Sequence, residues 1–227
     1  MRRIYTVARY KVVVFDLDGT LLDTSEGLIS SIQYTIREHG LKELDMETIE
    51  SFIGPPVQNS FRRVYGFDEA EANRVAATFR EHYKEYDLLK AKPYEGIYEV
   101  FDYLHINGIK PAIATYKRQD YATKILEHFG FNKYTNVMYG ADFEGKYKKK
   151  DIIENALRDC GITDRSEAIM VGDSDNDAIG AAAIGTKFIG VTYGFGFKSE
   201  ADVNAFDNIG CAADTRELID VIREVNS

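Results

Sequence analysis

The first segment that could do chemistry is a short apolar run that ends in two carboxylates. Residues Val12–Phe15 are followed by Asp16–Thr20, which reads Asp-Leu-Asp-Gly-Thr. Such a run is typical of a strand buried on both faces of a parallel sheet, and ligands bind beyond the carboxyl ends of these strands. Two like charges there require a cation or a catalytic task, and Mg²⁺ with its oxygen ligands meets the first need. The alternative is a solvated turn, since Asp-x-Asp-Gly is common turn chemistry.

A second acidic cluster follows another apolar run. Residues Ala168–Val171 lead through a glycine into a stretch that contains Asp173 and Asp177. The stretch is similar to a calcium-binding loop, but Ala178 stands where that loop needs glycine and Ile184 where it needs glutamate. Asp177 is also a candidate for capping a helix. Two acidic clusters, each at the end of a strand, are improbable by chance, and we expect them to form one site.

Two further groups have the chemistry to hold a phosphoryl group. Thr115 ends an apolar strand, so its hydroxyl can reach the same edge of the sheet; a helix cap or a turn is the alternative. A run of four lysines precedes the next helix. Most lysines in such a run are solvated, but one of them could neutralise the acidic site and a phosphoryl oxygen. The four are Lys146, Lys148, Lys149 and Lys150.

The elements that must position these residues alternate between strand and helix from about residue 95 onward. This rhythm predicts a doubly wound parallel sheet flanked by helices, which is an α/β fold with a Rossmann-like core. The predicted strands are Val12–Phe15, Ile109–Ala114, Asn136–Tyr139, Ala168–Val171, Lys187–Val191 and, more weakly, Ile209–Ala212. Near the end of the chain, Asp214 and Glu217 are expected to cap a last helix.

Residues from about 24 to 90 break this rhythm and are predicted to be all helical. One helix carries Leu28, Ile29, Ile32 and Ile36 on a face, and a longer one begins at Asp68. The apolar face of the longer helix is predicted to comprise Val75, Phe79, Tyr83 and Tyr86. An insert of this size after the first strand indicates a second domain. We therefore expect a core domain of residues 1–22 and 92–227 and a helical domain of residues 23–91.

Composition excludes several classes of protein. The chain has 227 residues, of which 44% are hydrophobic and 29% charged, as in an ordinary globular protein. Its 28 basic and 37 acidic residues give a formal net charge of −9, which disfavours a nucleic-acid polymer or an anionic membrane as a partner. Two cysteines are too few for a disulfide scaffold, and no apolar stretch is long enough to span a membrane. These features favour a reducing compartment, and we expect a cytoplasmic protein.

The motifs taken together resemble the haloacid-dehalogenase-like hydrolase superfamily. Order and spacing agree over essentially the whole chain, and an inserted helical domain after the first strand is similar to the subclass with an α-helical cap. The motifs are Asp16-x-Asp18-Gly19-Thr20, Thr115, Lys149 and Gly172-Asp173-x-x-x-Asp177.

The resemblance implies a catalytic role for each matching residue. Asp16 would be the nucleophile that forms an aspartyl-phosphate, a known form of covalent catalysis by a carboxylate. Asp18 would protonate the leaving alcohol and then activate the hydrolytic water. Thr115 and Lys149 would hold phosphoryl oxygens.

The resemblance also implies Mg²⁺ as the cofactor. Asp16, the backbone carbonyl of Asp18 and Asp173 would hold the ion, with Asp177 as a ligand or just behind the ligands. The ion would screen charge as an anionic phosphate approaches a carboxylate.

Two positions depart from the family's usual pattern. Members often carry Asn or Ser after the position of Thr115, where this chain has Tyr116. Many have Lys-Pro at the lysine motif, whereas Lys149 is followed by Lys150, so Lys148 stays a rival assignment. The expected substrate-binding residues are Gly19, Thr20, Tyr116, Lys148 and Arg62.

The same resemblance narrows the reaction. Asp18 argues against dehalogenation, because the dehalogenases lack this carboxylate, and Thr20 favours phosphatases over sugar-phosphate mutases. Residues 52–61 and Thr192–Gly196 are similar to segments of a 5′-nucleotidase-like branch close to phosphoglycolate phosphatases. We therefore expect a Mg²⁺-dependent phosphatase, a monomer or homodimer, that acts on a small phosphorylated metabolite such as a nucleoside 5′-monophosphate or phosphoglycolate. A phosphosugar mutase and a catalytically idle binding protein are the alternatives.

Overall fold

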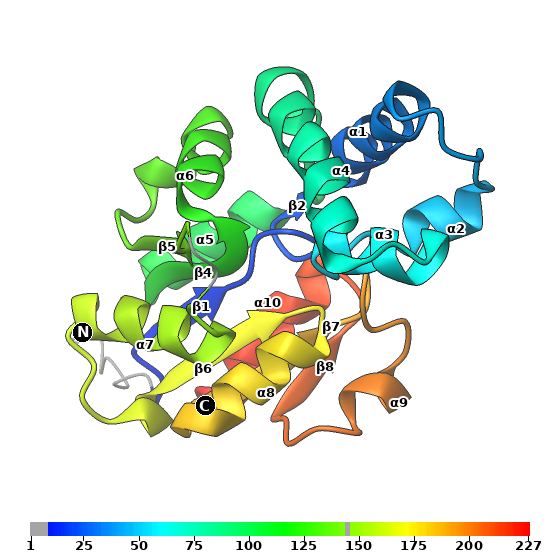
Figure 1. Cartoon of the computed structure of the whole chain (residues 1–227). Coiled ribbons are helices and arrows are strands. Elements are labelled where there is room, and N and C mark those ends of the chain that lie inside the picture. Colours follow the sequence, from blue (N-terminus) through cyan, green and yellow to red (C-terminus); the bar gives the residue numbers. More distant parts are fainter. Residues whose placement is uncertain (1–8, 144–145) are drawn as a thin grey trace, which may run out of the picture. The chain divides into compact units, whose positions relative to one another are not determined.

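The computed structural model describes residues 9–143 and 146–227. The chain divides into two compact units, one of Met1–Leu21 with Pro93–Ser227 and one of Leu22–Lys92 (Figure 1). Among the described residues, no helix combines the length and apolar character needed to cross a membrane.

The first unit is built on a six-stranded parallel sheet in the order β5-β4-β1-β6-β7-β8. The strands are β1 (Val12–Phe15), β4 (Lys110–Arg118), β5 (Met138–Ala141), β6 (Ala168–Gly172), β7 (Lys187–Val191) and β8 (Gly210–Ala212). Strand β1 is central and fully buried, which explains why it is apolar at every position. From β1 the chain proceeds to one side through β4 and β5, then returns to the other side at β6. The crevice at such a reversal is where open α/β sheets bind ligands.

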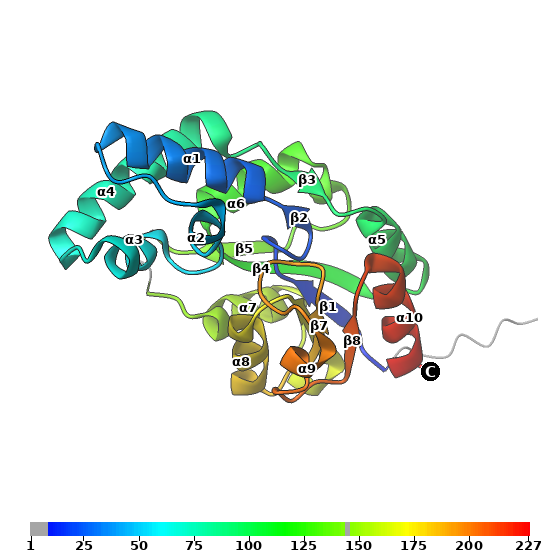
Figure 2. The same cartoon turned by 90° about the vertical axis from the view of Figure 1, so that its right-hand side faces the viewer.

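Helices cover both faces of this sheet, as the alternating rhythm of the sequence predicts (Figure 2). The helices of the unit are α5 (Ile97–Ile106), α6 (Gln119–His128), α7 (Lys149–Asp159), α8 (Asp175–Ile184), α9 (Glu200–Val203) and α10 (Thr215–Val225). Val12 and Val14 of β1 pack in one cluster with apolar residues of α7 and α8. Phe15 points to the opposite face and stacks on Phe101 of α5, with ring centroids 5.0 Å apart. The predicted α/β class is confirmed.

Two details of the core correct or confirm the sequence reading. Strand β4 continues to Arg118, four residues beyond the predicted end at Ala114. The predicted cap of the last helix is confirmed, because the Glu217 N–H donates to Asp214 Oδ1 at 2.8 Å and the Ala213 N–H donates to Glu217 Oε2 at 2.8 Å.

The second unit is helical, as predicted, with one short strand at its start. Its helices are α1 (Ser25–Glu38), α2 (Met46–Glu50), α3 (Val57–Tyr65) and α4 (Glu69–His82), and a π-helical turn η1 (Tyr83–Asp87) continues α4. Strand β2 (Leu22–Asp23) pairs with β3 (Lys92–Pro93) where the chain passes between the units. The longer helix begins where the sequence predicted, and Asp68 is its N-cap, accepting from the Glu71 N–H at 2.8 Å.

The π-helical turn explains the one wrong position on the predicted apolar face of α4. Val75, Phe79 and Tyr83 are buried, but Tyr86 is 72% exposed. A π-helical turn closes its hydrogen bonds five residues apart, which rotates the following side chains out of the α-helical phase. Asp87 is turned inward instead and is fully buried.

Buried Asp87 has several polar partners within the unit. Lys90 Nζ lies 2.7 Å from Oδ1, the Ser31 hydroxyl donates to Oδ2 at 2.7 Å, and His82 Nδ1 lies 3.2 Å from Oδ2. Burial opposes ionisation of this carboxyl, but Lys90 and Ser31 outweigh it and lower its pKa. Helix α1 approaches this turn closely at Gly27, whose N–H donates to the Lys90 carbonyl at 3.1 Å.

We predict that Gly27→Ala destabilises the protein, although alanine is the better helix former by about 1 kcal/mol. An added Cβ would lie 2.3 Å from the Asp87 carbonyl oxygen and 3.0 Å from that of Lys90. Overpacking against backbone costs about 1–3 kcal/mol, so the clash should win. Urea unfolding followed by circular dichroism measures the loss, with Glu38→Ala on the exposed end of α1 as the control. An unchanged or raised midpoint for Gly27→Ala would contradict the close approach.

Candidate active site

The carboxyl ends of β1, β4 and β6 meet at the crevice of the first unit. Asp16 follows β1 directly, and its N–H donates to the Val171 carbonyl of β6 at 2.9 Å. Asp173 follows β6, and Thr115 lies near the end of β4. Because these three strands are parallel neighbours, residues that are far apart in sequence converge at one edge of the sheet.

Three buried carboxylates lie together at this edge. Asp16, Asp173 and Asp177 each present an oxygen, and these oxygens lie within 4.8 Å of one another. Asp177 Oδ2 accepts from the N–H and the hydroxyl of Ser174, at 3.1 and 2.7 Å, so it caps α8 while Oδ1 faces the cluster. The N-cap of α8 is Ser174 and Asp177 is the third helical residue of its capping box, so Asp177 helps to cap the helix without being the N-cap that the sequence suggested.

Burial makes this cluster costly to ionise. It raises the pKa of Asp16 to about 7 and that of Asp173 to about 6, and the neighbouring charge of Asp177 adds to both shifts. Lys149 opposes the rise at Asp16. Backbone N–H groups of Gly196 and Phe195 oppose the rise at Asp173. A set of hard carboxylate oxygens with excess negative charge has the donor chemistry that Mg²⁺ prefers.

Lys149 is the lysine of the basic run that reaches the cluster. Its Nζ lies 2.7 Å from Asp16 Oδ1 and 2.7 Å from Asp177 Oδ1, and the residue is 2% exposed. Burial opposes its charge, but Asp16 and Asp177 outweigh burial and raise its pKa. Lys148 is exposed instead, so the rival assignment does not place an ammonium in the cluster. Lys146 and Lys150 are exposed as well.

The loop after β7 wraps around Asp173 with its backbone. The Phe195 and Gly196 N–H groups donate to Asp173 Oδ2 at 2.7 and 3.0 Å, and the Phe197 N–H donates to the Asp173 carbonyl at 2.7 Å. Glycine is required on both sides of this contact. A Cβ at Gly19, where φ is +79°, would lie 2.2 Å from Asp173 Oδ2, and one at Gly194 would lie 2.2 Å from the Gly19 carbonyl oxygen.

The sequence indicated only that Thr192–Gly196 is similar to a family segment, and the backbone contacts to Asp173 were not predicted. The alternation of glycines in Tyr-Gly-Phe-Gly was the available signal. Tyr193 also donates its hydroxyl to the Thr20 carbonyl at 3.1 Å. The Thr20 hydroxyl is buried without a hydrogen-bond partner among the described residues.

A bulge in β4 brings Tyr116 to Lys149 and Lys117 to Asp18. Ala114 pairs with Tyr139 and Arg118 with Ala141, so β4 advances four residues while β5 advances two. The looped-out residues are Thr115, Tyr116 and Lys117. Bulges next to active sites commonly re-aim side chains in this way. Gly140 permits the bulge, since a Cβ there would lie 2.6 Å from the Lys117 carbonyl oxygen.

Lys117 is the residue of the site that the sequence reading did not find. Its Nζ lies 2.9 and 3.0 Å from the two carboxylate oxygens of Asp18, and its side chain is buried. Thr115 is buried too, and its hydroxyl oxygen accepts from the Lys117 N–H at 3.1 Å, which leaves the hydroxyl proton to donate. A lysine in a polar segment is expected to be solvated. The only sign that Lys117 belongs to the site was its position two residues after Thr115.

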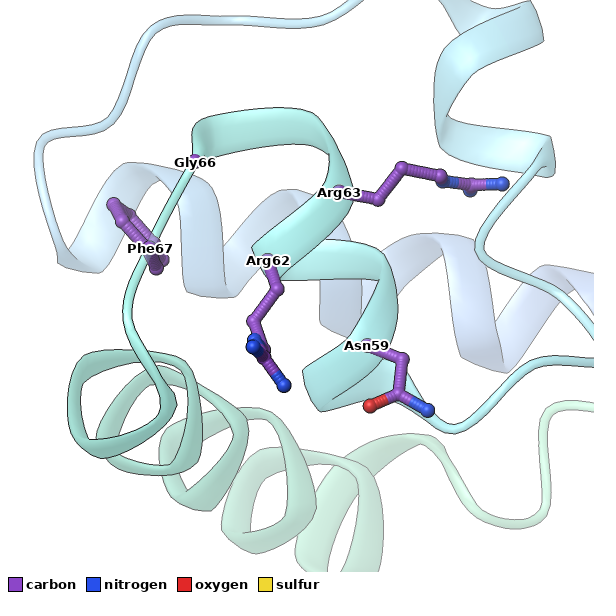
Figure 3. A pocket seen from close by; sticks show the side chains of 5 residues that line it. All are labelled: Asn59, Arg62, Arg63, Gly66 and Phe67. Carbon is purple, nitrogen blue, oxygen red and sulfur yellow. The ribbon is translucent and has the colours of Figure 1, made fainter.

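The remaining candidate, Arg62, belongs to the second unit. It is exposed on α3 and lines an open pocket of about 370 Å³ together with Asn59, Arg63, Gly66 and Phe67 (Figure 3). Arg63 turns toward Ser51, donating to its carbonyl at 2.8 Å and to its hydroxyl at 2.9 Å. Arg62 thus is not part of the carboxylate cluster of the first unit.

Comparison with known proteins agrees with this site. Residues 13–191 match the family described as haloacid dehalogenase-like hydrolase. A 5′-nucleotidase from Pseudomonas aeruginosa is 35% identical over 215 residues, which cover 94% of this chain and 96% of that protein. The pyrophosphatase PpaX from Halalkalibacterium halodurans is 33% identical over 211 residues, covering 92% and 95%.

A solved structure of a predicted phosphatase is also similar to this chain. The crystal structure of a predicted phosphatase from Clostridium acetobutylicum matches with a TM-score of 0.84 and 34% identity, covering 95% of this chain and 99% of that one. The fold, the converging carboxylates and these relatives agree, and the chain belongs to the haloacid dehalogenase-like hydrolase family, in which it is a phosphatase.

Proposed function

We propose that the protein hydrolyses a small phosphomonoester with Mg²⁺ as cofactor and Asp16 as the nucleophile, through an aspartyl-phosphate. The observation that carries this proposal is the cluster of three buried carboxylates, whose oxygens lie within 4.8 Å of one another with the Lys149 ammonium between two of them. Three carboxylates against one ammonium leave negative charge that a divalent cation offsets.

The donor set supports Mg²⁺. The carboxylates of Asp16 and Asp173 and the backbone carbonyl of Asp18 would hold the ion, with Asp177 as a further ligand or as support for the others. Burial first, and then the charge of Asp177, raises the pKa values of Asp16 and Asp173, so a cation would favour their ionised forms, and hard oxygen donors suit this ion. When bound, Mg²⁺ neutralises charge that builds up during phosphoryl transfer.

In the first half-reaction, an oxygen of Asp16 attacks phosphorus and the bond from phosphorus to the alcohol oxygen breaks. Asp18 gives its proton to the departing alcohol. Lys149 occupies Asp16 Oδ1 at 2.7 Å, which leaves Oδ2 to act as the attacking atom. Lys117 contacts both oxygens of Asp18 and would fix the orientation of that carboxyl group.

In the second half-reaction, water attacks the phosphorus of the aspartyl-phosphate. Asp18 takes the proton of the water, the bond from phosphorus to Asp16 breaks, and inorganic phosphate leaves. The Thr115 hydroxyl and the Lys149 ammonium hold phosphoryl oxygens in both steps. Thr20, whose buried hydroxyl is free to donate, and the backbone at Gly19 would complete the phosphate contacts. Tyr116 lies beside Lys149 and could contact the substrate there. The side chain of Lys148 is exposed, so we assign the phosphate contact to Lys149.

The name of the Pseudomonas relative supports a nucleoside 5′-monophosphate as substrate, and that of the Halalkalibacterium relative supports pyrophosphate as a competitor. Phosphoglycolate is the third candidate. In the second unit, the exposed guanidinium of Arg62 supports a contact with an anionic part of the substrate. A phosphate-release screen that compares kcat/KM for these compounds selects among them, because discrimination is expressed in kcat/KM.

Replacing the nucleophile tests the proposal most directly. Asp16→Asn should lower phosphate release from p-nitrophenyl phosphate by more than about a thousandfold, because an amide cannot form the phosphoryl intermediate. Asp175→Asn is the matched control, since Asp175 is exposed in the first turn of α8. Activity of the Asp16 variant within tenfold of wild type, with both proteins saturated with Mg²⁺, would refute the nucleophile.

The role of Asp18 predicts a dependence on the leaving group. Asp18→Asn should lower kcat/KM for an alkyl phosphate by about 10²–10⁴, because an alkoxide needs a proton as it leaves. The loss in kcat/KM for p-nitrophenyl phosphate should be much smaller, since p-nitrophenolate leaves without protonation. Asp214→Asn, at the cap of α10, serves as the control. Equal losses for both substrates would remove Asp18 from the acid–base role.

The raised pKa values predict how metal and pH act on stability. The unfolded chain releases the protons of Asp16 and Asp173 near pH 3.8, whereas the folded chain holds them to about pH 7 and 6. Without metal, this contribution to stability is therefore full below about pH 4 and lost as the pH rises toward 7. Mg²⁺ competes with these protons, so it should raise Tm more at about pH 8 than at about pH 5. Equal gains at both pH values, or a full gain in Asp173→Asn, would argue against the site.

A further inference from the structure

The side chain of Lys149 is buried, but its backbone N–H lies at a helix end, where it needs an acceptor from outside the helix. Lys149 is the first residue of α7, and the first N–H groups of a helix have no partner within the helix. The preceding residue, Lys148, stands at the N-cap, and its side chain has no acceptor atom to offer. Its backbone does anchor the turn, because the Lys148 carbonyl accepts from the Asp151 N–H at 2.9 Å. The N–H of Lys149 still needs an acceptor from outside the helix.

Tyr116 supplies the missing acceptor from another element. Its hydroxyl oxygen accepts from the Lys149 N–H at 2.8 Å. Its ring also lies near the side chain, with Lys149 Nζ 5.8 Å from the ring centroid. The β4 bulge is what brings Tyr116 there, because it interrupts the pairing with β5 between Ala114 and Arg118. A second acceptor is local, since Asp151 Oδ2 accepts from the Lys148 N–H at 2.9 Å.

The other contacts of Lys149 hold its stem and its head. The stem lies against Gly180 of α8, where an added Cβ would meet Lys149 Cβ at 3.0 Å and Cγ at 2.9 Å. The head lies 2.7 Å from both Asp16 and Asp177. A lysine side chain has four rotatable bonds, so fixing its backbone and stem removes most of the freedom that binding would otherwise have to restrict.

We propose that Tyr116 is a positioning residue: its hydroxyl fixes the first turn of α7 and thereby the Lys149 ammonium that binds the phosphoryl group. This inference rests on the proposed function, because it needs Lys149 as a phosphate ligand.

The test is Tyr116→Phe, which removes the hydroxyl and keeps the ring. Loss of one hydrogen bond to a ligand-binding residue should raise the inhibition constant of inorganic phosphate and KM for p-nitrophenyl phosphate by about three- to tenfold. Because Lys149 holds the phosphoryl group in both the ground state and the transition state, kcat should change by less than about twofold. Unchanged KM and unchanged phosphate inhibition would overturn the proposal.

Tyr98→Phe is the matched control. The Tyr98 hydroxyl, also on the first unit, donates to the Phe129 carbonyl at 2.8 Å and so makes one bond to backbone, like that of Tyr116. This variant should lower the unfolding midpoint without moving KM or phosphate inhibition. If both variants shifted KM equally, the effect of Tyr116 would be one of general stability, and the positioning role would be wrong.

The double variant Tyr116→Phe/Lys149→Met separates positioning from direct contact. If Tyr116 acts through Lys149, adding Tyr116→Phe to Lys149→Met should have no further effect on phosphate inhibition. A further multiplicative loss would mean that Tyr116 contacts phosphate itself, which overturns the proposal. If Lys149→Met alone leaves phosphate inhibition unchanged, the proposed role of Lys149 fails and the inference falls with it. If phosphate inhibits Lys149→Met only weakly but inhibits Tyr116→Phe as it does the wild type, Lys149 keeps its proposed role. Only the positioning role of Tyr116 is then wrong.

Discussion

The rest of the structure depends on one constraint: three carboxylates are buried together at the end of β1, and a single ammonium is bonded to two of them. The charges of three neighbouring carboxylates, those of Asp16, Asp173 and Asp177, repel one another. Lys149 lies between two of them and offsets part of this negative charge. An arrangement of this kind is costly for a fold and useful for a phosphatase, because the residual negative charge that destabilises the site is charge that a divalent cation would offset.

Several close backbone approaches in the first unit serve this cluster. Gly19 and Gly194 allow the segments after β1 and β7 to close on Asp173, and Gly180 lets the stem of Lys149 lie against α8. Gly140 permits the β4 bulge that turns Tyr116 toward Lys149 and Lys117 toward Asp18. Close backbone approaches at these glycines thus help to hold the residues of the cluster.

The outline of the site was predictable because its main residues follow strands that are neighbours in a parallel sheet. The apolar runs before Asp16 and Asp173 indicate strands buried on both faces of a parallel sheet. Because parallel strands end at the same edge of a sheet, the residues that follow them come together. Lys117 was not predictable, since the bulge that re-aims it leaves no signature in the hydropathy of β4. Tyr86 was wrongly placed for a related reason: the π-helical turn changed the helical phase within an otherwise regular apolar stripe.

The amino-acid sequence alone determined the α/β class, the helical insert and the two acidic clusters, because these follow from local periodicity and from residue types at strand ends. Tertiary structure decided which lysine of the basic run enters the site and which loop binds Asp173. It also decided that Lys117 contacts Asp18 and that Tyr116 contacts the first turn of α7. The physical reason is that a hydrogen bond or an ion pair depends on distances of about 3 Å between groups that lie up to 133 residues apart in the chain, and only the packing of the strands and helices sets those distances.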